Sequence, residues 1–179
     1  IPLPEGVVEC RNISYGSHEK WNLLDVYYPQ GTNAPLPTIV SIHGGGWFYG
    51  SKELYSHYCM DLALRGFTVV NFSYRLAPEH KYPAAIEDCC TVLHWVQKNA
   101  AEYFIDLKNI FTVGDSAGGQ LNFQLLTILS SPKFAALFPF KAPEGFRVNA
   151  CGLNCGCYFL PFSRLLPPRR MGEIFEALM

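Results

Sequence analysis

One serine in the sequence stands where it could act as a nucleophile. Ser116 lies in the run GDSAGG at positions 114–119, between a segment typical of a strand and a segment typical of a helix. This is the G-x-S-x-G pattern of a nucleophile elbow, in which a serine occupies the tip of a sharp strand-to-helix turn. Glycines two residues before and two residues after the serine avoid side chains that would collide in such a turn. The pattern therefore predicts acyl transfer with Ser116 as the nucleophile.

A second glycine-rich segment could stabilise the negative charge that develops in acyl transfer. The sequence HGGGW occupies positions 43–47, directly after a short apolar strand. Residues without a Cβ let backbone N–H groups approach a substrate oxygen, and one such donor typically lowers the barrier by about 2.7–4 kcal/mol. The helix after Ser116 would add the amide of Ala117 and its positive dipole end. A phosphate-binding alternative is disfavoured, because neither G-K-[ST] nor a G-x-G-x-x-G fingerprint is present.

Three segments together resemble those of hormone-sensitive-lipase-like α/β-hydrolases. They are HGGGW at 43–47, YRLAPEH at 74–80 with YPAA at 82–85, and GDSAGG at 114–119. The resemblance implies an α/β-hydrolase fold and serine-dependent cleavage of carboxylic esters. Carried over position by position, Ser116 is the nucleophile and the oxyanion hole comprises Gly44, Gly45, Gly46 and Ala117. In this set Gly44 would shape the loop, and the amides of Gly45, Gly46 and Ala117 would donate hydrogen bonds to the oxyanion. Asp115 and positions 74–85 would be structural supports of the site.

The sequence does not identify the base and the acid that such a serine needs. A serine hydroxyl is a weak nucleophile at neutral pH and requires a histidine oriented by a carboxylate. In this fold the acid and then the histidine follow the serine along the chain. After Ser116 there is no histidine and no aspartate, and the histidines all precede it, at positions 18, 43, 57, 80 and 94. We therefore expect the acid and the base beyond Met179. His43 is expected to anchor the backbone of the glycine-rich segment.

Alternating strands and helices are predicted around these motifs. Strands are expected at 7–15, 21–28, 38–42, 67–74, 110–113 and 147–156, and helices at 53–65, 84–104, 117–130 and 171–179. The first two strands read as a hairpin, and the later alternation is typical of a mostly parallel sheet with helices on both faces. We expect one α/β-hydrolase domain over 1–179, with the C-terminal strands of the fold missing from this chain. Residues 157–179 are interpreted as the start of a lid or connector.

Composition excludes several classes of protein. The chain has 179 residues, 49% of them hydrophobic and 16% charged, with a formal net charge of −1, which is typical of a globular domain. Fourteen basic residues against fifteen acidic ones, without a run of like charge, disfavour a nucleic-acid partner. The most apolar region, 121–140, is interrupted by polar residues and proline before reaching the roughly 18 apolar residues of a membrane span. Stable membrane insertion is not expected, and surface association of this region is an alternative.

Seven cysteines, an odd number, favour reduced thiols and a cytoplasmic protein over a disulfide framework. Cys151, Cys155 and Cys157 could together bind zinc, but they lack paired C-x2-C spacing and a nearby fourth ligand. They are interpreted as buried strand thiols in an apolar run. No metal or organic cofactor is expected, because the predicted chemistry needs only side chains and backbone amides.

The predicted function is hydrolysis of small acyl esters through an acyl-enzyme at Ser116. Trp47, Phe48 and Tyr49 suggest an aromatic-walled pocket for a small substrate, or alternatively pack against the sheet edge. Deacetylases and amidases share this machinery and form one alternative. The absence of a histidine after Ser116 motivates another, a catalytically silent hydrolase-fold protein that binds a small ligand or a partner. The sequence makes no prediction of oligomeric state.

Overall fold

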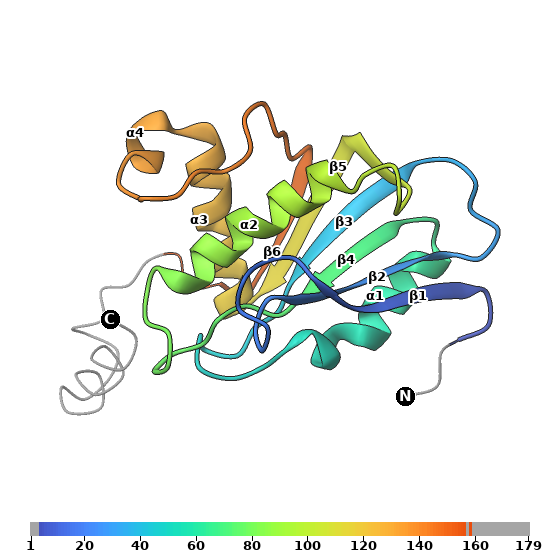
Figure 1. The fold of residues 1–179 in the computed structure, drawn as a ribbon, viewed down its shortest axis with the longest axis horizontal. Coiled ribbons are helices and arrows are strands. Elements are labelled where there is room, and N and C mark those ends of the chain that lie inside the picture. The colour runs from blue at the N-terminus through green and yellow to red at the C-terminus, as the bar shows by residue number, and fades with distance from the viewer. Residues whose placement is uncertain (1–3, 157, 159–179) are drawn as a thin grey trace.

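Six strands form one sheet in the order β1-β2-β4-β3-β5-β6 in the computed structural model, which describes residues 4–156 and 158 (Figure 1). The strands are β1 (Val7–Ser14), β2 (Leu23–Pro29), β3 (Leu36–Ile42), β4 (Thr68–Phe72), β5 (Ile105–Asp115) and β6 (Ala150–Asn154). β1 pairs antiparallel with β2, and β2 antiparallel with β4, whereas β4, β3, β5 and β6 are mutually parallel. The predicted hairpin and mostly parallel sheet are confirmed.

Helices cover both faces of this sheet, as predicted (Figure 1). They are the 3-10 turn η1 (Lys52–Tyr55), α1 (Ser56–Leu64), α2 (Ala84–Lys98), α3 (Ala117–Ser130) and the short α4 (Pro132–Ala135). Neighbouring strand residues belong to different core clusters, because side chains alternate across a strand. Val40 and Val70 pack with α2 and α3, whereas Ile39 and Val69 pack with α1. The parallel strands are therefore buried on both faces, which explains their continuous apolar sequences.

The second predicted helix ends earlier than its apolar spacing indicated. α2 stops at Lys98, where the side-chain amide of Asn99 donates a 2.8 Å hydrogen bond to the carbonyl of Trp95. Phe104 has a positive φ of 53°, which is incompatible with continuing the helix, and its carbonyl accepts from the amide of Leu36 at 2.8 Å. The prediction of helix over 99–104 is therefore wrong. β5 instead begins at Ile105, earlier than predicted, because Ile105 pairs with Leu36.

The prediction that Cys151 and Cys155 are buried strand thiols is wrong. Cys151 lies on β6 and is exposed, as is Cys155 just after the strand. β6 has no neighbouring strand on its outer edge within the described residues. These two thiols are therefore exposed, whereas the sequence predicted that they are buried. Cys157 lies outside the described residues. The described part of the chain contains no group of three or more histidine, cysteine, aspartate or glutamate residues that could hold a metal ion.

The apolar region 121–140 has two different halves. On α3, Leu121, Leu125 and Ile128 are buried against the sheet, as their helical spacing predicts. Beyond α3, Leu137 is 73% exposed.

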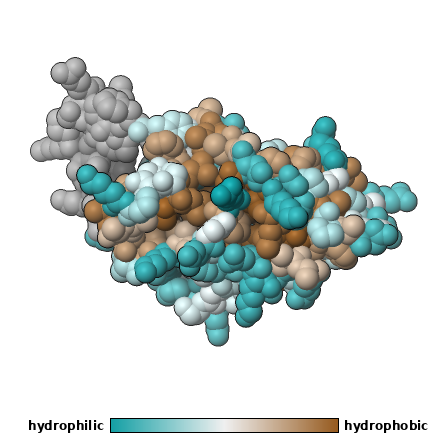
Figure 2. Space-filling model, turned by 90° about the horizontal axis from the view of Figure 1, so that it is seen from above, coloured by the Kyte–Doolittle hydropathy of each residue, from teal (hydrophilic) through white to brown (hydrophobic). Residues whose placement is uncertain are grey.

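Figure 2 shows hydrophobic residues gathered in the middle of the face seen there, bordered by hydrophilic ones. None of the helices in the described ranges has both the length and the apolar character that crossing a membrane requires. The predicted connector and last helix, 157–179, lie outside the described residues apart from position 158.

Candidate active site

Ser116 stands on a strained turn between β5 and α3. Its backbone angles are φ 50° and ψ −116°, a combination that costs a non-glycine residue about 1–3 kcal/mol and requires support from its surroundings. That support includes a 2.8 Å hydrogen bond from the Ser116 amide to the carbonyl of Asn154 on β6. The Ser116 side chain is exposed and makes no capping hydrogen bond to α3. A serine hydroxyl is thus held at the carboxyl end of the parallel strands, where ligands bind in α/β sheets.

The two glycines flanking Ser116 allow three backbone segments to touch. A Cβ on Gly118 would lie 2.1 Å from the carbonyl oxygen of Ile42 and 2.6 Å from that of His43. A Cβ on Gly114 would lie 2.4 Å from the carbonyl oxygen of Gly118. Neither contact leaves room for a side chain. The first turn of α3 is therefore pressed against the end of β3, which brings the HGGGW segment beside the serine turn.

Residues 43–51, which we call the glycine loop, leave β3 and make a tight turn. The carbonyl of Gly45 accepts hydrogen bonds from the amides of Phe48 and Tyr49, at 3.1 and 3.0 Å. Gly45 has a φ of 123°, and a Cβ there would lie 2.0 Å from the carbonyl oxygen of Tyr49. Only glycine fits this position. The internal hydrogen bonds of this turn use the Gly45 carbonyl and not the Gly45 amide.

Tyr55 connects the glycine loop to the serine turn. Its hydroxyl accepts a 3.2 Å hydrogen bond from the amide of Gly44 and donates a short one to the carboxylate of Asp115. Burial, with the neighbouring Asp115 carboxylate, raises the pKa of Tyr55 to about 12, so the phenol keeps its proton at neutral pH. A Cβ on Gly44 would meet Asp115 Oδ2 at 2.8 Å. Tyr55 was not predictable as a site residue from the sequence, because it belongs to no motif and lies within a segment predicted only as a helix.

His43 supports the start of the glycine loop, as the sequence predicts. Its buried ring stacks on Tyr74 with centroids 4.0 Å apart, and the Tyr74 hydroxyl donates a 2.9 Å hydrogen bond to the His43 carbonyl. His43 Nδ1 lies 2.7 Å from the carbonyl oxygen of Gly44. A carbonyl only accepts, so Nδ1 must carry the proton and the neutral ring leaves Nε2 unprotonated. Burial lowers the pKa of His43 to about 4.

This buried histidine should make stability depend on pH. The unfolded chain binds a proton on His43 near its ordinary pKa of 6.5, whereas the folded protein resists protonation down to about pH 4. As far as His43 is concerned, the free energy of unfolding should therefore be highest above pH 6.5 and fall as the pH is lowered toward 4. Between pH 7 and pH 5 we expect a loss of about 2 kcal/mol from this group in urea unfolding. If His43→Asn lost as much stability between pH 7 and pH 5 as wild type does, this assignment would be contradicted. The control is His57→Asn, at an exposed position of α1, which should keep the pH dependence of wild type.

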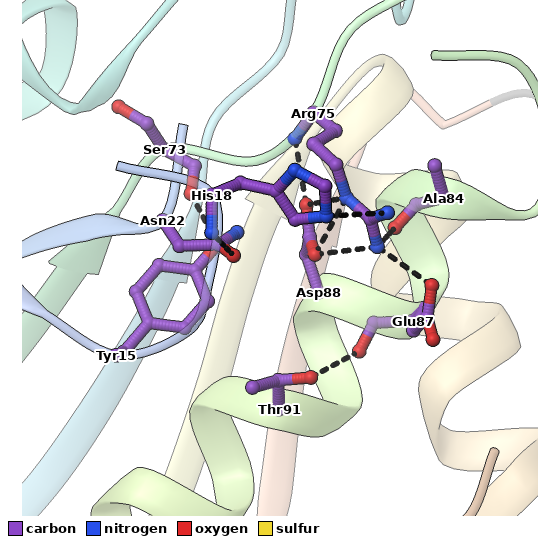
Figure 3. A network of polar contacts seen from close by, with 9 residues as sticks. All are labelled: Tyr15, His18, Asn22, Ser73, Arg75, Ala84, Glu87, Asp88 and Thr91. Atoms are coloured by element: carbon purple, nitrogen blue, oxygen red, sulfur yellow. Dashed lines mark hydrogen bonds and ion pairs between the residues drawn. The ribbon is translucent and has the colours of Figure 1, made fainter. Parts of the chain in front are cut away.

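Arg75 fastens the segment at 74–80 to α2 (Figure 3). Its guanidinium lies 2.8 Å from Asp88 Oδ1 and 2.7 Å from Glu87 Oε2, and donates to the carbonyl of Ala84 at 3.2 Å. The Arg75 amide donates to the other oxygen of Asp88 at 2.8 Å. Figure 3 also shows His18 of the β1–β2 connection beside the guanidinium, 3.3 Å from Nε2 to Nη1. These contacts are those of a structural support, as the resemblance implies for this segment.

No histidine of the chain is hydrogen-bonded to Ser116 within the described residues. His43 bonds its own loop, His94 Nε2 lies 2.9 Å from the carbonyl of Lys141, and His57 is exposed on α1. His18 lies against Arg75 and packs edge-to-face on His80, with ring centroids 5.4 Å apart. None of the five histidines is therefore placed as the base of Ser116 in the described part of the chain, and the sequence predicted none of them in that role.

Trp47, Phe48 and Tyr49, which follow the triple glycine, do not together line one pocket. Trp47 packs against the core under α2 and α3. Phe48 and Tyr49 are 57% and 58% exposed and pack edge-to-face on each other. A separate cavity of about 310 Å³ lies on the α1 side of the serine turn, and it is lined by Ser41, Ile42, Leu54, Tyr55, Tyr58, Val113, Gly114, Asp115 and Asn154. None of the three aromatic residues lines it, so this cavity is not the predicted aromatic-walled pocket.

A mostly parallel sheet between layers of helices, with a serine on the strained turn after the internal strand β5, defines an α/β-hydrolase fold. Among solved structures, esterase B from Lactobacillus rhamnosis in its tributyrin phosphonate complex superposes with a TM-score of 0.86 at 32% identity. That match covers 97% of this chain and 56% of the esterase. The hyperthermophilic esterase from the archaeon Pyrobaculum calidifontis gives a TM-score of 0.71 at 30% identity, covering 99% of this chain and 58% of that one.

Sequence comparison places the chain in a family. Residues 24–150 match the family described as BD-FAE, and the chain belongs to that family. Over 125 residues it is 40% identical to carboxylesterase NlhH of Mycobacterium tuberculosis. This match covers 67% of the chain and 38% of that carboxylesterase, so the chain spans well under half of that relative. The resemblance to hormone-sensitive-lipase-like α/β-hydrolases is thereby confirmed.

Proposed function

We propose that this protein hydrolyses carboxylic esters with Ser116 as the nucleophile. The observation that carries the proposal is the exposed serine on a strained turn, with the glycine loop in backbone contact beside it. Similar proteins named as esterases and carboxylesterases support the same activity. The catalytically silent alternative rests only on the missing histidine. It gives no chemical reason for holding an exposed serine in a costly backbone conformation.

In the proposed reaction, Ser116 Oγ attacks the carbonyl carbon of the ester and forms a tetrahedral intermediate. The amides of Gly45, Gly46 and Ala117 donate hydrogen bonds to its oxyanion, and Gly44 keeps the loop close to Asp115. Collapse of the intermediate expels the alcohol and leaves an acyl group on Ser116, which water then hydrolyses. A histidine other than the five in this chain is proposed to take the serine proton and pass it to the leaving alcohol.

The proposed substrates are esters with small acyl groups. Phe48 and Tyr49 are the exposed aromatic side chains of the glycine loop, so they are available to contact the substrate. A related deacetylase or amidase activity would use the same nucleophile and oxyanion donors.

The cytoplasmic location stays a prediction.

A fluorophosphonate probe tests the nucleophile directly. The probe should form one covalent adduct on the protein, and tandem mass spectrometry should place it on the peptide that contains Ser116. The Ser116→Ala variant should remain unlabelled under the same conditions. Absence of labelling on the folded wild-type protein would favour the ligand-binding alternative. Labelling that persists in Ser116→Ala would assign the reactive serine elsewhere.

A further inference from the structure

The far end of the glycine loop is fastened by a buried lysine. Lys52 follows the loop directly, and only 3% of its side chain is exposed. Its Nζ lies 2.9 Å from each carboxylate oxygen of Asp25 on β2, and 2.7 Å from Oε1 of Glu53. The Asp25 side chain is also 3% exposed, whereas Glu53 is 62% exposed. The principal partner of the ammonium group is therefore a carboxylate inside the protein.

The backbone of Lys52 is held as firmly as its side chain. Its amide donates a 3.0 Å hydrogen bond to Ser73 Oγ, and its carbonyl accepts a 2.7 Å hydrogen bond from the side-chain amide of Asn71. Asn71 on β4 pairs in register with Asp25 on β2 and with Ser41 on β3. A buried polar row thus crosses the sheet under η1 and α1, and Lys52 is joined to two of its members.

The carboxylate of Asp25 is fully occupied. In addition to the lysine, it accepts a 2.8 Å hydrogen bond from the amide of Asn12 and a 3.2 Å hydrogen bond from the Tyr27 hydroxyl. A buried ion pair is weak evidence for stability, because well-packed apolar residues of similar volume are often equally stable or more so. What such a network offers instead is a single geometry, because only one arrangement of these buried groups satisfies all of their hydrogen bonds.

The glycine loop is therefore attached at both ends. His43, Tyr74 and Tyr55 hold its beginning, and Lys52 holds its end on β2 and β4. We propose that Lys52 is a positioning residue, whose buried ion pair with Asp25 keeps the loop amides where the oxyanion of a Ser116 reaction forms. This inference rests on the proposed ester hydrolysis for its catalytic consequence. The attachment of the loop can be measured independently of activity.

The kinetic test compares Lys52→Met with wild type on p-nitrophenyl acetate, at a temperature where both are folded. Because a loop misplaced by about 1 Å can cost about 100-fold in rate, we expect kcat to fall about 10- to 100-fold. KM should change little, since the oxyanion donors act mainly in the transition state. Lys52→Arg keeps a positive charge beside Asp25 and should retain more of the wild-type kcat. Arg65→Met removes the exposed Arg65–Asp61 pair at the end of α1 and should leave kcat unchanged.

A merely structural role would lower stability and spare kcat. If folded Lys52→Met keeps kcat within about twofold of wild type, the proposal is overturned. Should Lys52→Met fail to fold, Asp25→Asn preserves the side-chain volume while removing the negative charge. It should show a fall in kcat in the same direction, and an unchanged kcat there would equally overturn the proposal.

Hydrogen exchange separates this proposal from the proposed activity. Peptides covering residues 44–51 should exchange faster in Lys52→Met than in wild type, while peptides from α3 should not change. Unchanged exchange in the loop would overturn the positioning role whatever the kinetics show. If wild type and Ser116→Ala hydrolyse esters equally, the proposed function fails. The exchange comparison then still decides whether Lys52 holds the loop.

Discussion

Replacing Ser116 with alanine should lower kcat for p-nitrophenyl acetate by about 10³-fold or more, because the covalent route through the serine is lost. The glycine loop and the Ala117 amide would remain in place, so the residual rate should exceed that in buffer alone. Alanine should not disturb the fold, since the Ser116 side chain is exposed and makes no capping hydrogen bond to α3. Initial rates on p-nitrophenyl esters from acetate to decanoate provide the measurement. Rates on the shorter esters should be the highest.

Ser130→Ala is the matched control for this prediction. Ser130 is exposed, and its hydroxyl donates to carbonyls of the preceding turn of α3, at 2.8 Å to Leu126 and 3.5 Å to Thr127. Its removal should leave kcat unchanged. Equal rates for wild type and Ser116→Ala would show that position 116 is not the nucleophile.

Replacing Arg75 with methionine should destabilise the protein by about 3–5 kcal/mol, because it leaves a buried carboxylate without its cation. The side chains of Arg75 and Asp88 are only 11% and 3% exposed, and they lie 2.8 Å apart. Removing the guanidinium also leaves the carbonyl of Ala84 without that donor. Urea unfolding at pH 7, followed by circular dichroism, measures the difference in the free energy of unfolding.

Two comparisons isolate the buried charge as the cause. Arg65→Met breaks an exposed ion pair with Asp61 and should cost no more than about 0.5 kcal/mol. The double variant Arg75→Met with Asp88→Leu removes both charges and should regain much of the lost stability. If Arg75→Met costs no more than Arg65→Met, the network in Figure 3 is not holding the 74–80 segment to α2.

The motifs were predictable because each depends on a few adjacent residues. Gly114 is needed by the local geometry of the turn and Gly118 by its contact with the end of β3, but both lie at a fixed spacing from Ser116 and are therefore visible as a pattern. The strands around it were found from short apolar runs and the helices from apolar spacing. The end of α2 was missed because its apolar residues continue at helical spacing to Tyr103. The hydrogen bond from Leu36 to Phe104, which draws this segment toward the sheet, lies far away in sequence.

The sequence by itself determined the succession of strands and helices along the chain, the serine turn and the family, because these depend on local patterns and short motifs. Only the tertiary structure decided which residues far apart in the sequence meet around the serine turn. Tyr55 joins Gly44 to Asp115, and Lys52 binds Asp25, which belongs to the polar row of the sheet. It also decided that Cys151 is exposed, since exposure depends on what lies beside β6. Such contacts follow from the strand order β2-β4-β3-β5, and no spacing along one chain segment encodes which strands become neighbours.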